Sequence, residues 1–329
     1  MKISKKQIDA LNLEITLEIV KDDYAEIVRK KLAERRRTAD FKGFRKGMAP
    51  ESMIRRVYGE QILAEAVNQL VSQGLYDFIE KEKLHILGEP LGSEKQPELE
   101  WKDGNDFTFI FDIALYPEVN VDAGKSDSIN SYKISVSAQD KKNMKESYKK
   151  YYEDKEEKKS DEEIDKEITE RLTAEYENQS EWRLNSDIRK HFVKKAAVEL
   201  PEAFLKRWLA ASNEEVKSEE LEKEFPGFLE DFRWQLVRSA FMKKYGFKIE
   251  KEDIEDAARA YVTYQYAMYG MSNVPEDIIN NSAEQLLSDR KQIDRLVEQV
   301  EDRKVISKLK EEITLNSKKI SSDKFRELK

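Results

Sequence analysis

Residues 12–20 read NLEITLEIV, and this stretch decides the fold of the first part of the chain. Apolar residues at every odd position alternate with polar ones, which is typical of a strand that buries one face. Residues 107–115 (FTFIFDIAL) repeat the alternation. Two helical segments lie between these strands: one runs from Asp22 to about Arg37, and a longer one has an apolar stripe from Ile62 to Ile79. The order strand, helix, helix, strand predicts an α+β domain.

The rest of the chain differs in composition. Residues 117–137 are expected to form a linker and a short strand, and the following charged run lacks a substantial apolar stripe, so it predicts a solvated helix or a mobile connector. Helical spacing returns from Ile164, with Pro201, Pro226 and Pro275 placed where the first turns of helices are expected. We predict an α+β domain over 1–116, a linker and the start of a helical body over 117–160, and a mainly α-helical body over 161–329.

Composition limits the classes of function. The 329 residues allow about two domains, and the high charged fraction of 38% favours an elongated shape with much surface. The formal net charge of −8 excludes a generally basic nucleic-acid coat. Cysteine is absent, which excludes disulfides, thiolate metal sites and a cysteine nucleophile and suits a reducing cytosol. The chain has no stretch typical of a signal peptide or a membrane span, so we expect a soluble cytoplasmic protein without a membrane partner.

The sequence offers little support for catalysis. Its two histidines, His85 and His191, lie far apart, and none of the common hydrolase, metalloprotease or nucleotide-binding motifs occurs. Both histidines are expected to be partly exposed helix or surface residues, and the many carboxylates are expected to be solvated. The sequence therefore predicts no enzyme active site, no metal and no cofactor.

The most informative segment is FKGFRKGMAP at 41–50, which glycines and a proline mark as an exposed loop between two helices. Residues 29–46 carry nine cationic and two acidic side chains, a local charge of +7 in an acidic protein. Such a cluster attracts phosphate or an acidic protein surface. Phe44 beside Arg45 and Lys46 combines an aromatic anchor with two charges, as binding hot spots do. The alternative is that Phe44 folds back onto the domain and the cations are merely solvated.

The loop and its flanking elements resemble the ribosome-binding signature of the bacterial trigger factor family, whose members are chaperones that meet nascent chains at the ribosomal tunnel exit. The resemblance rests on Gly43-Phe44-Arg45-Lys46, with Pro50, Tyr58 and Gly59, and continues through YPEV (116–119) and AVELPEAFLKRWL (197–209). It implies that the loop docks on a large-subunit ribosomal protein and adjacent rRNA, and that residues 138–329 form a helical body with two arms. The expected ribosome-binding residues are Gly43, Phe44, Arg45, Lys46, Arg36, Arg37 and Lys42.

Large side chains in the helical part suggest where unfolded polypeptides would bind. Most are expected to pack helices together, but YVTYQYAMYGM (261–271) places aromatic residues and methionines around more than one helix face. Such adaptable side chains suit a surface that holds many sequences weakly, without ATP. The expected client-binding residues are Trp208, Phe232, Tyr261, Tyr264, Met268, Tyr269 and Met271.

One departure from the family pattern leaves more than one function open. Trigger factors usually carry an inserted prolyl isomerase domain of the FKBP type, which here would fall near Lys158–Asp161, and no such domain is recognisable in this sequence. The main hypothesis is an ATP-independent chaperone that docks at the tunnel exit; the alternative is a prolyl isomerase chaperone whose catalytic domain is missing from the sequence. A general RNA-binding factor and, less favoured, a periplasmic chaperone also stay open, as does homodimerisation off the ribosome.

Overall fold

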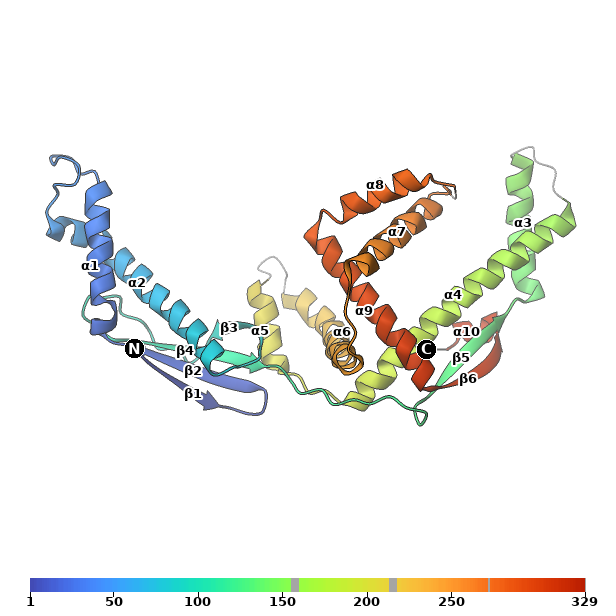
Figure 1. Ribbon diagram of the computed structural model, residues 1–329, viewed down its shortest axis with the longest axis horizontal. Coiled ribbons are helices and arrows are strands. Elements are labelled where there is room, and N and C mark those ends of the chain that lie inside the picture. Colours follow the sequence, from blue (N-terminus) through green and yellow to red (C-terminus); the bar gives the residue numbers. More distant parts are fainter. Residues whose placement is uncertain (155–159, 213–217, 272, 329) are drawn as a thin grey trace. The chain divides into compact units, whose positions relative to one another are not determined.

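A computed structural model describes residues 1–154, 160–212, 218–271 and 273–328. The chain forms two compact units (Figure 1). The first unit contains Met1–Glu118 and Glu199–Leu229, and the second contains Val119–Val198 and Glu230–Lys329. The sequence grouped Glu199–Leu229 with the helical body, whereas in the structure these residues pack with the N-terminal part of the chain.

The first unit is built on a four-stranded antiparallel sheet in the order β1-β2-β4-β3. The two predicted strands are confirmed as β2 (Asn12–Ile19) and β4 (Phe107–Leu115), which pair along their lengths. Four alternate residues of β2 are at most 2% exposed, as the two-residue period requires. The sequence analysis missed the edge strands β1 (Lys2–Gln7) and β3 (Ile86–Gly92).

Three helices of this unit pack on the sheet or share its core. The predicted helices are α1 (Lys21–Thr38) and α2 (Glu51–Lys81), which bury their apolar stripes in the same core as β2 and β4. The third helix, α5 (Glu202–Ser212), packs on β3 and β4. There the Arg207 guanidinium binds the Asp112 carboxylate at 2.7 Å and the Gly92 carbonyl at 2.8 Å. A salt bridge and a carbonyl contact thus attach a distant part of the chain to the sheet.

The second unit contains a two-stranded parallel sheet, β5 (Ser128–Ser135) and β6 (Thr314–Ser321). β5 packs on α4 (Asp161–Ala196), which begins with a capping box between Ser160 and Glu163. The charged run forms α3 (Ala138–Asp154), and it does have an apolar contact: Met144 and Tyr148 pack against buried residues of α4. The prediction of a solvated helix is therefore correct for only part of the surface of α3. Residues 155–159 of the run lie outside the described residues.

The remaining helices are α6 (Ser218–Tyr245), α7 (Lys251–Met268), α8 (Glu276–Leu286), α9 (Arg290–Glu312) and α10 (Ser322–Arg326). α7, α8 and α9 share a small apolar core. Pro201 precedes α5 and Pro275 precedes α8, as predicted, but Pro226 lies inside α6. Pro226 has no backbone N–H, so α6 lacks one backbone hydrogen bond at this position. No helix in the described ranges is long and apolar enough to cross a membrane.

Candidate functional site

The loop at 41–48 consists of two successive tight turns. The Phe44 N–H donates to the Phe41 carbonyl at 3.0 Å, and the Met48 N–H donates to the Arg45 carbonyl at 2.8 Å. Gly43 and Gly47 occupy the third position of each turn, with φ values of 95° and 84°. A type II turn requires positive φ there, and glycine adopts it without steric cost. The local sequence therefore determines the shape of this loop.

Side chains from α1 and α2 hold the base of the loop. The Arg36 Nε donates to the carbonyl of Ala49, which is only 2% exposed, at 2.8 Å. The Arg35 guanidinium lies over the Tyr58 ring, 4.3 Å from its centre, and Phe41 meets the same ring edge-on at 6.2 Å. Contacts with Tyr58 and the Ala49 carbonyl thus anchor both ends of the loop. Arg36 supports the loop through its hydrogen bond to the Ala49 carbonyl.

The tip of the loop is exposed. The Phe44 side chain is 38% exposed, and Lys42, Arg45 and Lys46 are exposed beside it. Neither these three cations nor Arg37 has an acidic partner in the part of the chain that the structure describes. The structure thus brings Gly43, Phe44, Arg45, Lys46 and Lys42 together at one tip.

Replacing Arg36 with alanine should loosen the loop without unfolding the unit. The Ala49 carbonyl loses its donor, so we expect a loss of about 1 kcal/mol in the free energy of unfolding and several-fold faster chymotrypsin cleavage after Phe44. Arg37→Ala is the matched control, because Arg37 has no recorded partner among the described residues, and it should leave the cleavage rate unchanged. Equal cleavage of the two variants would contradict the supporting role of Arg36.

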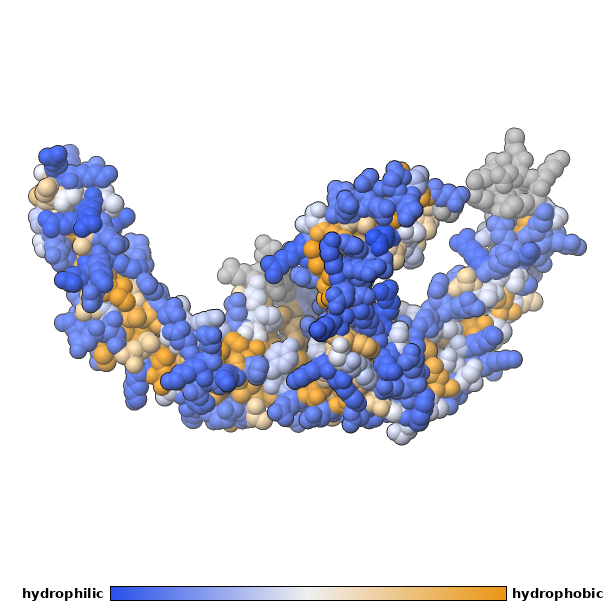
Figure 2. All heavy atoms as spheres, viewed as in Figure 1, coloured by the Kyte–Doolittle hydropathy of each residue, from blue (hydrophilic) through white to orange (hydrophobic). Residues whose placement is uncertain are grey.

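A second exposed surface lies on α7 and the residues that follow it. Tyr261, Tyr264 and Met268 repeat at helical spacing, and two more large side chains follow the helix end. All five are exposed: Tyr261 37%, Tyr264 64%, Met268 70%, Tyr269 80% and Met271 54%. Ala258 and Val262, on a neighbouring face of α7, are buried. Figure 2 shows apolar side chains among hydrophilic ones on this part of the second unit. We call these five exposed side chains the α7 stripe.

A pocket of about 460 Å³ adjoins the α7 stripe. Tyr261 and Tyr269 line it from α7 and the helix end, and Ser282 and Leu286 line it from α8. The pocket residues on α8 were not predicted, because nothing in the local sequence indicates which helix packs beside α7. The other two expected client-binding residues do not join the stripe. Trp208 lies on α5 in the first unit, against Gly88, and Phe232 is a half-buried residue of α6.

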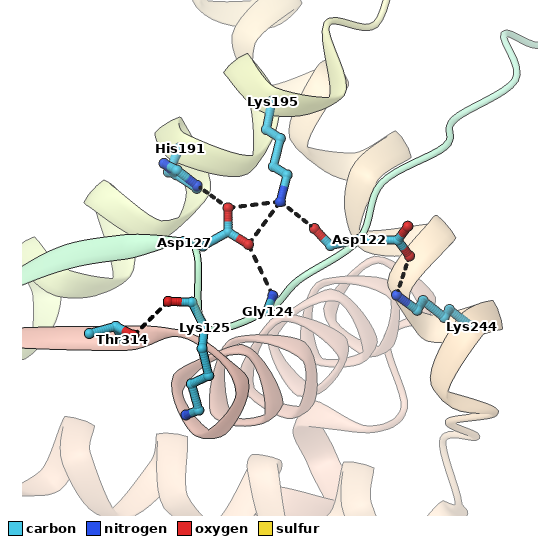
Figure 3. Close-up of polar contacts among 8 residues, drawn as sticks. All are labelled: Asp122, Gly124, Lys125, Asp127, His191, Lys195, Lys244 and Thr314. Carbon is cyan, nitrogen blue, oxygen red and sulfur yellow. Dashed lines mark hydrogen bonds and ion pairs between the residues drawn. The ribbon is translucent and has the colours of Figure 1, made fainter.

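His191 belongs to a polar cluster around the buried Asp127 (Figure 3). The Asp127 carboxylate lies 2.9 Å from the His191 Nε2 and 2.8 Å from the Lys195 Nζ, and it accepts from the Gly124 N–H at 3.0 Å. Lys195 also donates to the Asp122 carbonyl at 2.7 Å. Burial acts to raise the pKa of Asp127, but the hydrogen bonds from Lys195, His191 and Gly124 outweigh it and hold this pKa below its ordinary value.

The arrangement around Asp127 is a structural anchor. An Asp–His pair can serve catalysis when a nucleophile lies within reach of the histidine. In the described ranges no hydroxyl is recorded within hydrogen-bonding distance of His191. The same ranges contain no group of three or more metal-ligating side chains. The cluster joins the segment before β5 to the last turns of α4.

Comparisons with known proteins agree with this organisation. Residues 1–148 match the family model described as bacterial trigger factor protein, and residues 180–329 match that described as probable trigger factor, C-terminal domain. A trigger factor of Saccharophagus degradans is 29% identical over 147 residues, 45% of this chain and 32% of that protein. One of Citrifermentans bemidjiense is 32% identical over 121 residues, 37% of this chain and 27% of that protein. The chain thus spans about a third or less of the length of these curated relatives.

One solved structure has a similar fold over nearly the whole chain. It comes from work on promiscuous substrate recognition in folding and assembly activities of the trigger factor chaperone. The match covers 94% of this chain and 99% of that one, with a TM-score of 0.54 and 13% sequence identity. At this identity the likeness concerns the fold alone.

Proposed function

Because this chain belongs to the trigger factor family, we propose that it is an ATP-independent chaperone that docks at the ribosomal tunnel exit and holds nascent or unfolded polypeptides. The exposed tip of the loop at 41–48 carries this proposal. A half-exposed aromatic ring between exposed cations suits a surface made of a large-subunit protein and adjacent rRNA. The anchored base of the loop lowers the entropic cost of binding, since the loop is already ordered.

The α7 stripe is the surface we propose for unfolded polypeptides. Tyrosine and methionine side chains tolerate many partner sequences, because methionine adapts its shape and tyrosine combines an apolar ring with a polar end. The affinity of such a surface is expected to be modest, so release needs no nucleotide. Docking on the ribosome would raise the local concentration of emerging chain without stronger contacts.

We propose that this chain acts by holding unfolded polypeptides rather than by catalysing the isomerisation of their prolyl bonds. The two matched family ranges leave only residues 149–179 between them. That segment is shorter than an ordinary domain, and most of it belongs to α3 and α4. Docking on ribosomes would also place the protein in the cytoplasm.

The test of this function uses the unmodified chain. We expect it to co-sediment with purified ribosomes at low salt, and less at high salt, because the cations of the loop replace counterions. We also expect it to reduce the light scattering of chemically denatured citrate synthase as it is diluted, without ATP. A chain that neither pellets with ribosomes nor reduces scattering would overturn the proposal. Pelleting that does not depend on Phe44 would favour a general RNA-binding factor.

A further inference from the structure

β6 is an exposed edge strand. Its eight residues pair with β5 in a continuous parallel register, and in the described part of the chain the sheet has only these two strands. Leu315–Lys319 are five consecutive exposed residues. A strand normally buries every second residue, so exposure of five in a row means that both faces of this stretch are open to solvent. β6 lies at the lower right margin of the second unit in Figure 1.

The two ends of β6 are fixed although its middle is exposed. The Thr314 N–H donates to the Asp127 carbonyl at 2.8 Å, and the Thr314 hydroxyl donates to the Lys125 carbonyl at 2.8 Å. At the other end, Ser321 caps α10, and the Ser322 hydroxyl donates to the Asp140 carboxylate at 2.8 Å. The strand is therefore held extended at both ends, and its edge offers backbone N–H and C=O groups in a fixed geometry.

The charge on this edge indicates what can pair with it. Lys318 and Lys319 are exposed, and neither has an acidic partner among the described residues. A second copy pairing β6 with β6 in an antiparallel manner would bring these lysines close together, and like charges opposite each other destabilise a sheet. Lysines on an edge strand commonly oppose such self-association. A segment that carries Asp or Glu meets no such repulsion.

We propose that the outer edge of β6 takes an extended, acidic segment of an unfolded polypeptide as a third strand. This inference rests on the proposed chaperone function and names a mode of recognition for it. Strand addition binds through main-chain hydrogen bonds, which every polypeptide can make, while flanking side chains bias the choice. The β6 edge would bind extended clients that have too few aromatic or apolar side chains to bind the α7 stripe.

The experiment measures binding of two fluorescent eight-residue peptides to the full chain by anisotropy. One peptide alternates valine and glutamate, and the other alternates valine and lysine. We expect the acidic peptide to bind at least ten-fold more tightly. Lys318→Glu with Lys319→Glu should reverse this preference. The control, Lys190→Glu with Lys324→Glu, makes the same charge change at exposed positions outside β6 and should preserve the preference.

Two further measurements separate strand addition from simple charge attraction. An acidic peptide N-methylated at every residue cannot donate ladder hydrogen bonds and should not bind. Hydrogen exchange should show slower exchange of β6 amides when the unmodified acidic peptide is present. Binding that survives N-methylation, or that leaves β6 exchange unchanged, would overturn the inference. Ribosome co-sedimentation of the same preparation shows whether the proposed function stands independently.

Discussion

A variant with Phe44→Ala, Arg45→Ala and Lys46→Ala is expected to bind ribosomes at least about 100-fold more weakly than the unmodified chain, a loss of about 2.7 kcal/mol. Truncation of an aromatic anchor and its neighbouring cations removes the groups that dominate the affinity of such interfaces. The slope of binding against salt concentration should also fall, because two cations that are proposed to contact rRNA phosphates are lost. Equilibrium co-sedimentation across a ribosome titration measures both effects.

The fold should survive this triple replacement. The three side chains lie at the exposed tip, and the glycines that set the turns remain. A matched control is Lys6→Ala, Tyr76→Ala and Lys81→Ala, which removes one exposed aromatic and two exposed cations elsewhere in the same unit. The control should pellet like the unmodified chain. If the two triple variants bind ribosomes equally, the loop is not the docking element.

Asp127→Ala is expected to lower the free energy of unfolding by about 2 kcal/mol at pH 7. This value lies within the net contribution that hydrogen bonds to a charged group make to stability. The Asp127 side chain is only 6% exposed and accepts from Lys195, His191 and the Gly124 N–H. The lysine and the histidine are about one third exposed and can turn to water, which limits the loss. Urea denaturation followed by circular dichroism measures this change.

The pH dependence has a definite sign. Because the pKa of Asp127 is lower in the folded chain than its ordinary value of 3.8, the folded state favours the charged form. Its contribution is complete above the unfolded pKa and is lost as the pH falls through the folded value. The difference between Asp127→Ala and the unmodified chain should therefore shrink below about pH 4. Asp122→Ala is the control: its side chain is 87% exposed and pairs with Lys244, so its loss should lower the free energy of unfolding much less than the loss of Asp127 does. A constant difference at all pH values would contradict this role for the Asp127 charge.

Much of the first unit was predictable from the sequence because its signals are local. β2 and β4 are visible as alternating apolar residues, and the glycines at 43 and 47 mark turns that require positive φ. The exposed tip could be found from the same ten residues. What those residues do not show is the contact between Arg36 and the Ala49 carbonyl, which places Arg36 at the base of the loop.

Two of the strands that the sequence did not indicate, β1 and β6, share one property. β1 has a single half-buried residue, Ile3, and β6 has exposed residues at five successive positions. Both are held mainly by backbone hydrogen bonds to a neighbouring strand, which almost any sequence can make, so neither shows the apolar alternation that marks a half-buried strand. Their partners cannot be found by local pattern alone.

The sequence by itself determined β2, β4, α1 and the apolar stripe of α2, because their buried residues repeat along one short segment. It also determined the two turns of the loop, because they depend on glycine at positions 43 and 47. Only the tertiary structure decided which distant segments meet. It paired β5 with β6, which lie 186 residues apart at Ser128 and Thr314, and packed α5 on the sheet of the first unit. It also left the α7 stripe exposed while burying Ala258 and Val262 of the same helix. The reason is physical. The spacing of apolar residues along a segment indicates whether one face of a helix or strand is apolar. Which other segment packs on that face depends on the packing of the whole chain.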